Sequence, residues 1–98
     1  MELENFRIND IPALLWGKKS NKVFIAVHGN LSCKEDEGIR MLAEKVVDKG
    51  YQVLSFDLPE HGEKKGDASY LCKVQNCVAD LKRVMEYARE NFEEVSLW

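Results

Sequence analysis

Short apolar runs alternate along the chain with longer stretches in which apolar residues recur every three or four positions. The runs cover residues 23–28 and 51–56, and a third begins within 93–98. The run from Val23 to Val27 is unbroken, which is typical of a parallel strand buried on both faces, and the longer spacing is typical of helices packed on a sheet. The order strand, helix, strand, helix, strand therefore predicts an α/β domain.

The first seventeen residues follow a different pattern. "NFRI" and "IPALLW" are short apolar-rich segments separated by Asn9-Asp10, a pair typical of tight turns. We therefore predict an N-terminal β-hairpin. The whole chain, 1–98, is then one domain with a three-layer, mostly parallel sheet that begins with this hairpin.

The stretch after residue 28 predicts the first helix. Ser32 with Glu35 three positions later is a capping box, so we expect Ser32 to be the N-cap. Helical apolar spacing runs to residue 47, and Gly50 is a typical helix end.

A second helix is predicted from about Ser69 to Phe92. Its apolar residues form one stripe, which we interpret as packing on the sheet rather than as a coiled-coil seam. The stripe consists of Leu71, Val74, Val78, Leu81, Met85, Ala88 and Phe92.

Composition and charge exclude several classes of protein. The net charge of −3, with Lys and Arg scattered among Asp and Glu, gives no case for binding nucleic acid or an anionic membrane. No apolar run approaches the roughly 20 residues that span a bilayer, and the acidic start "MELENFRIND" is unlike a signal peptide. We expect a cytoplasmic protein.

The cysteines give no disulfide framework or zinc site. Cys33, Cys72 and Cys77 are odd in number and include no CxxC pair. We expect three reduced thiols, with Cys72 and Cys77 on one helix and pointing in different directions.

The candidate chemistry lies at His28-Gly29, where a buried strand ends before a helix. Glycine lets the backbone approach a bound group closely, and free N–H groups near a helix N-terminus attract negative charge. A tetrahedral oxyanion is such a charge. The chain lacks both the phosphate-loop pattern and G-x-G-x-x-G, so we expect no cofactor.

Three motifs in this order resemble the N-terminal half of an α/β-hydrolase, the superfamily of serine esterases, lipases and peptidases. "VFIAVHGN" resembles its third strand and oxyanion turn, "YQVLSFDLPEHGE" its fourth strand and D-x-P-x-H-G loop, and "EEVSLW" its fifth strand. In the family that fifth strand runs directly into the G-x-S-x-G nucleophile elbow.

The resemblance implies half of an oxyanion hole. It places one backbone N–H donor at Asn30, with Leu31 as the next candidate, while the second donor, the serine, the acid and the catalytic histidine would follow later in a complete protein. We therefore expect an unfinished hydrolase for an ester, thioester or amide substrate, without turnover by this chain alone. Candidate partners at the strand from Val95 to Trp98 are a C-terminal fragment or a second copy.

The other polar residues have competing interpretations. His28 and His61 have the residue type of a general base, and Asp57 that of a triad acid, but we favour a site-shaping role for them, with Gly29 and Gly62. Asp57, Glu60, His61 and Glu63 are better explained as a solvated loop than as a metal site. Ser32 and Cys33 lack an evident base to activate them as nucleophiles. The alternative function is a stand-alone, non-catalytic binding module.

Overall fold

A computed structural model of the chain describes residues 1–29, 32–66 and 71–98. Five strands form one sheet in the order β1-β2-β4-β3-β5. The elements are β1 (Leu3–Ile8), β2 (Ile11–Trp16), β3 (Lys22–Val27), α1 (Glu37–Val46), a 3-10 turn (Val47–Lys49), β4 (Gln52–Phe56), a second 3-10 turn (Gly62–Lys64), α2 (Val74–Asn91) and β5 (Glu94–Leu97).

The pairings confirm the predicted sheet. β3 pairs in parallel with β4 on one side and with β5 on the other, while β2 runs antiparallel to β1 and β4. Four strands therefore point the same way, and β2 points the opposite way. β5 lies at one edge of the sheet among the described strands, although an apolar strand of this kind is typical of the sheet interior.

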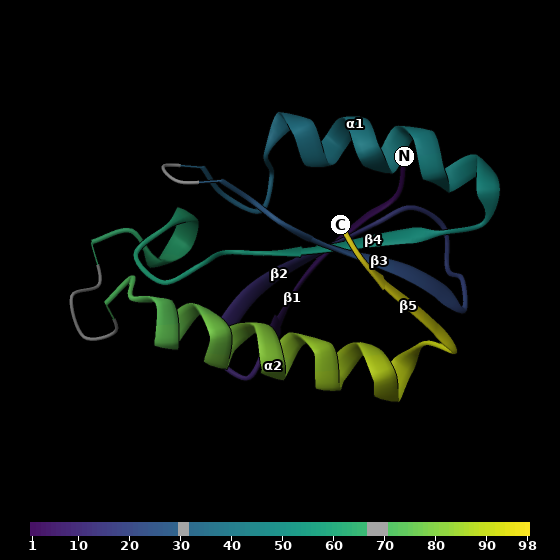
Figure 1. The fold of residues 1–98 in the computed structure, drawn as a ribbon. Helices are drawn as coiled ribbons and strands as arrows, with labels where there is room; N and C mark the ends of the chain where they lie inside the picture. The colour runs from purple at the N-terminus through teal and green to yellow at the C-terminus, as the bar shows by residue number, and fades with distance from the viewer. Residues whose placement is uncertain (30–31, 67–70) are drawn as a thin grey trace.

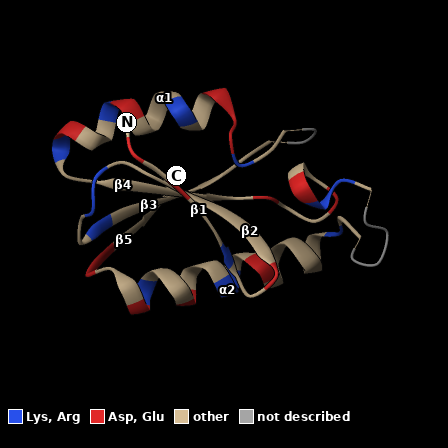
Figure 2. Ribbon diagram, turned by 180° about the vertical axis from the view of Figure 1, so that it is seen from behind, with Lys and Arg blue, Asp and Glu red and all other residues tan. Residues whose placement is uncertain are grey.

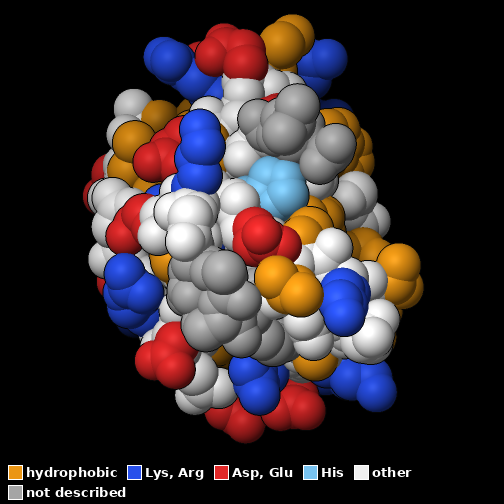
Figure 3. Space-filling model, turned by 90° about the vertical axis from the view of Figure 1, so that its left-hand side faces the viewer, with side chains coloured by type: hydrophobic (Ala, Val, Ile, Leu, Met, Phe, Trp, Pro, Cys, Tyr) orange, Lys and Arg blue, Asp and Glu red, His pale blue; other side chains and the backbone are white. Residues whose placement is uncertain are grey.

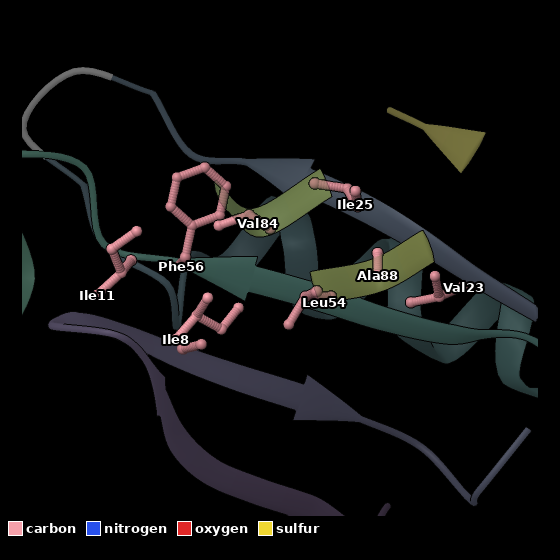
Figure 4. Close-up of a cluster of buried hydrophobic side chains, with 9 residues drawn as sticks. Ile8, Ile11, Val23, Ile25, Leu54, Phe56, Val84 and Ala88 are labelled. Atoms are coloured by element: carbon pink, nitrogen blue, oxygen red, sulfur yellow. The ribbon is translucent and has the colours of Figure 1, made fainter. Parts of the chain in front are cut away.

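The two helices lie on opposite faces of the sheet, so the domain has three layers (Figure 1). Side chains alternate between the faces along each strand, which splits the core in two. The larger cluster lies beneath α2 (Figure 4) and contains Ile8, Ile11, Ala13, Val23, Ile25, Leu54, Phe56, Val84 and Ala88. The cluster beneath α1 contains Leu14, Trp16, Ala26, Ile39, Ala43, Val46 and Val53.

The N-terminal hairpin is confirmed. Ile8 pairs with Ile11, so Asn9 and Asp10 form a two-residue loop. Asn9 has a φ of 54°, a left-handed conformation that asparagine tolerates better than most residues. Local chemistry therefore accounts for this turn.

The predicted start of the first helix was wrong. Asp36, not Ser32, is the N-cap, and its carboxylate accepts hydrogen bonds from the backbone N–H groups of Gly38 and Ile39. Ser32 instead donates its hydroxyl to that same carboxylate. The hydrogen bonds that hold Asp36 ionised lower its pKa, with the Ser32 hydroxyl first among them. The predicted end at Gly50 is confirmed, with a φ of 83°.

The second helix begins at Val74, later than predicted, and the predicted start at Ser69 lies outside the described residues. The N-terminal end of the apolar stripe does not pack on the sheet as predicted, because Val74 and Val78 are 79% and 47% exposed. Farther along, Val84 and Ala88 are fully buried. The first turns of α2 extend past the core beneath the sheet, so apolar spacing there does not produce burial.

Acidic and basic residues are interspersed along α1 and along the second half of α2 (Figure 2). Within residues 1–29, 32–66 and 71–98, no helix combines the length and apolar character that a membrane crossing requires.

Candidate functional site

The candidate site lies at the edge of the sheet where β3 and β4 end. Parallel pairing brings the carboxyl ends of β3, β4 and β5 to this edge, where open α/β sheets bind ligands. Figure 3 looks onto this end, and histidine reaches the surface among hydrophobic and charged side chains.

His28 joins the ends of β3 and β4. Its Nε2 accepts a hydrogen bond from the backbone N–H of Leu58 at 3.0 Å, and its Nδ1 lies 2.7 Å from the carbonyl oxygen of Gly29. Nε2 must be the bare nitrogen, so Nδ1 carries the proton and donates it. The side chain is 4% exposed, and both of its ring nitrogens are occupied by backbone. This arrangement suits a residue that shapes the loops and leaves no nitrogen for a general base.

Gly29 faces open space. A Cβ added there would meet no atom of the described residues within 4 Å outside its chain neighbours, and its backbone is not in the left-handed region. The folded chain therefore does not itself require a glycine at this position. Absence of a side chain leaves the backbone accessible from outside. The donor candidates Asn30 and Leu31 lie outside the described residues.

Asp57 is the centre of the site. Its carboxylate is fully buried and accepts the backbone N–H of Lys34 at 2.8 Å and that of Glu63 at 3.0 Å. The Lys34 ammonium lies 3.2 Å from Oδ2 of the same carboxylate. Asp57 therefore ties the loop after β3 to the loop after β4.

Lys34 is 2% exposed, which is rare for a lysine. Its ammonium contacts Glu63 at 2.7 Å and Glu35 at 3.5 Å besides Asp57. Burial by itself lowers the pKa of the Lys34 ammonium, but hydrogen bonds to Glu63 and Asp57 more than offset it, so the pKa lies above the ordinary lysine value. The buried carboxylate of Asp57 is thus held beside a permanent cation at neutral pH.

The main chain of Lys34 is anchored at both ends. Its N–H donates to Asp57, and its carbonyl accepts from the Ser55 hydroxyl at 2.7 Å. Ser55 is in turn held by the indole N–H of Trp16 at 2.9 Å. Lys34 is four positions beyond Asn30, so one end of the predicted oxyanion loop is attached to the central strand of the sheet.

Position 62 requires a glycine because the Asp57 carboxylate lies against its backbone. It has a φ of 54°, and an added Cβ would lie 2.1 Å from Oδ1 of Asp57. Beside it, His61 is 9% exposed, and its Nδ1 lies 2.8 Å from the Pro59 carbonyl. The His28 and His61 rings stack at a tilt, with centroids 5.1 Å apart. These contacts order the loop that follows Asp57.

The prediction of a solvated loop was wrong for two of its four residues. Glu60 and Glu63 are exposed, but Asp57 and His61 are buried. The Lys34 ammonium and the backbone N–H groups of Lys34 and Glu63 compensate the Asp57 carboxylate for the loss of water. Within the described ranges, no three His, Cys, Asp or Glu side chains are placed to hold a metal ion.

The remaining nucleophile candidates have other surroundings. Ser32 donates its hydroxyl to Asp36, and burial, first among several causes, raises the pKa of the Cys33 thiol, which lowers its reactivity. Cys72 precedes α2 instead of lying in it, and its sulfur is 3.9 Å from that of Cys77. The prediction that these two cysteines point apart on one helix was therefore wrong.

Sequence reasoning missed Lys34 and Ser55. A lysine between Cys33 and three acidic residues looks like part of a solvated helix start, and nothing local signals its burial. The sequence hint is Ser55 itself, a polar residue between Leu54 and Phe56 in an apolar-rich strand. A buried hydroxyl needs a partner, which predicts a polar neighbour but does not identify it.

No family model matches the chain, and no curated protein matches it in sequence. Solved structures do match. An esterase of Pyrococcus furiosus is 24% identical with a TM-score of 0.78, over 98% of this chain and 40% of its own. A ferulic-acid-bound esterase of Butyrivibrio proteoclasticus is 19% identical with a TM-score of 0.74, over 96% and 41%. A thioesterase domain from the curacin biosynthetic pathway is 24% identical with a TM-score of 0.65, over 89% and 33%. The chain thus spans less than half the length of each.

Proposed function

We propose that this chain, which has the α/β-hydrolase fold implied by its sequence motifs, is the N-terminal part of a serine hydrolase domain for ester, thioester or amide bonds. Its own contribution would be one half of the oxyanion hole, from the backbone N–H of Asn30 or Leu31. The nucleophile, the acid and the catalytic histidine would come from polypeptide that follows Trp98.

The register between β3 and β5 is the observation that carries this proposal. Ile25 is level with Leu97, an offset of 72 positions. The same offset sets Gly29 level with position 101, the third residue after Trp98. If G-x-S-x-G followed Trp98 directly, its serine would be that third residue. A nucleophile there would emerge beside the backbone turn that follows His28.

The structure of the loops supports a preorganised donor at this turn. His28 holds the strand end to Leu58, and Lys34 holds the far end of the loop to Asp57. Preorganised donors lower the barrier because they need not reorient when the oxyanion forms. Open space before Gly29 gives a substrate carbonyl access to them.

The first test is whether a longer protein exists with an activated serine. Protein isolated from its native cells is analysed by denaturing intact mass and labelled with a fluorophosphonate. We expect a mass above 11.3 kDa and a label on one serine beyond position 98. A single species of 11.3 kDa that takes no label would overturn the proposal.

The second test removes the donor. In that longer protein, Asn30→Pro and Leu31→Pro each delete a backbone N–H, while Asn30→Ala and Leu31→Ala keep it. One proline variant should lose about 10²–10³ in kcat against its alanine control. Equal kcat values within both pairs would show that neither N–H is a donor.

A stand-alone binding module is the second candidate, and the exposed edge strand favours it. β5 has one pairing partner among the described strands, and Leu97 and Trp98 are each 57% exposed. Such an edge can pair with another strand, from a C-terminal fragment or a second copy of the chain. Light scattering decides this for the purified chain: a stable dimer supports the module, and a dispersed monomer rejects self-association.

A further inference from the structure

We propose that Cys72 and Cys77 form a reversible disulfide with a low-molecular-weight disulfide such as oxidised glutathione as the oxidant. The proposal is independent of the hydrolase function. It rests on the short distance between the two thiols, which their separation in the sequence had not indicated.

The two sulfur atoms are already in contact, 3.9 Å apart. A disulfide has an S–S bond of about 2.05 Å, so they need to approach by roughly 2 Å. Cys72 is exposed and precedes the helix, where its side chain can rotate without disturbing helical hydrogen bonds. Cys77 is in the first turn of α2, and its backbone N–H donates to Lys73.

The surroundings hold Cys72 near Cys77. The Cys72 backbone N–H donates to the Glu60 carboxylate at 2.5 Å, and the Asn76 side chain donates to the Leu71 carbonyl at 2.6 Å. The segment before the helix is thus attached at one side to the loop after β4 and at the other to α2. A pair held in proximity reacts as an intramolecular couple, which favours the disulfide over two mixed disulfides.

The two thiols differ in reactivity. Burial, and then the hydrogen bond and charge of the neighbouring Cys72, raise the pKa of the Cys77 thiol. Cys72 is also the more exposed of the two. The first attack therefore falls to Cys72, and Cys77 resolves the mixed disulfide.

The steps balance. The Cys72 thiolate attacks one sulfur of oxidised glutathione, the glutathione S–S bond breaks, and one glutathione thiolate leaves. The Cys77 thiolate then attacks the Cys72 sulfur and displaces the second glutathione. The leaving thiolates take up the two thiol protons. Two protein thiols are oxidised, and one glutathione disulfide is reduced to two thiols.

The disulfide would change the groove next to it. Both cysteines line an apolar groove of about 340 Å³ between the ends of β3 and β4 and the start of α2, together with Val27, Phe56 and Leu81. Drawing Cys72 onto the helix moves one wall of this groove. The thiol pair is thus placed to alter an apolar surface according to the redox state.

The experiment is a glutathione exchange of the purified chain at pH 8, quenched with acid. We expect the number of free thiols to fall from three to one and the mass to fall by two hydrogen atoms. Trypsin cuts after Lys65, Lys73 and Lys82, so peptides 66–73 and 74–82 should remain joined until reduction.

Two variants serve as controls. Cys33→Ser should lose two thiols at the same glutathione ratio, because Cys33 takes no part. Cys77→Ser should stop at one glutathione on Cys72. Any of four results for the wild-type chain would overturn the proposal: three thiols that stay reduced, a mixed disulfide that persists, a disulfide that includes Cys33, or a disulfide-linked dimer.

Discussion

Replacing Gly62 with alanine tests how the site is held together. The new Cβ would lie 2.1 Å from Oδ1 and 2.4 Å from Oδ2 of Asp57. A Cβ essentially never lies closer than 3.0 Å to such an atom, so the carboxylate or the loop has to move. Either movement separates Asp57 from the Lys34 and Glu63 donors.

The cost has two parts. Alanine in the left-handed region costs about 1 kcal/mol against glycine. Breaking a buried, hydrogen-bonded ion pair costs about 3–5 kcal/mol, because one charge is left without its partner. The sum, about 4–6 kcal/mol, is comparable to the whole stability of a small domain, about 5–15 kcal/mol.

Gly66 provides a matched control. Its φ is 87°, and a Cβ there meets no described atom within 4 Å. Gly66→Ala should therefore cost only the backbone part, about 1 kcal/mol. The difference between the two variants isolates the contact with Asp57.

The assay is urea unfolding followed by tryptophan fluorescence, since Trp16 is 5% exposed and reports on the core. The free energy of unfolding should be at least about 3 kcal/mol lower in Gly62→Ala than in Gly66→Ala. If the two variants differ by less than about 1 kcal/mol, Asp57 does not hold the loops as argued. In a Lys34→Met, Asp57→Ala background the difference should disappear.

Three further outcomes are expected. Lys34→Met alone should lower the free energy of unfolding by about 3 kcal/mol. Adding Asp57→Asn should restore part of it, because the uncompensated charge is gone, although the amide NH2 then faces one of the two backbone N–H donors. Urea midpoints that do not recover at all would argue against the ion pair. Folding raises the pKa of Lys34, so the stabilisation that its charge gives the fold is complete below the unfolded pKa of about 10.4. This stabilisation is lost as the pH rises through the folded pKa. Lys34→Met should therefore flatten the alkaline fall in the free energy of unfolding. Folding lowers the pKa of Asp36, so the stabilisation that its charge gives the fold is present above the unfolded pKa of about 3.9 and is lost as the pH falls through the folded pKa. In thermal melts between pH 7 and pH 3, Asp36→Asn should therefore lose less stability on acidification than the wild type. An unchanged pH profile would contradict the cap.

The site was only partly predictable. The position of His28-Gly29 at the end of a buried strand follows from local pattern, and the chain order of the motifs places it at the carboxyl edge of the sheet. The partners of His28 do not follow, because the Leu58 N–H comes from a different loop 30 positions away. Whether Asn30 or Leu31 donates to an oxyanion stays a prediction.

The sequence by itself determined the elements that depend on near neighbours. The Asn9-Asp10 turn, the apolar strands and the helix end at Gly50 all follow from turn chemistry and spacing, because their interactions join residues a few positions apart. The burial of β3 and β4 also follows from their apolar residues, whereas β5 is partly exposed because it lies at the edge of the sheet.

The tertiary structure decided what depends on distant partners. Ser32 and Asp36 are both adequate N-caps, and the anchoring of Lys34 to Asp57, 23 positions away, is a contact that local sequence preference does not contain. The burial of Lys34 likewise needs a carboxylate from another strand end. Cys72 and Cys77 meet only because α2 begins after Cys72. In each case the stabilising contact joins residues that only folding brings together, so no local sequence pattern predicts it.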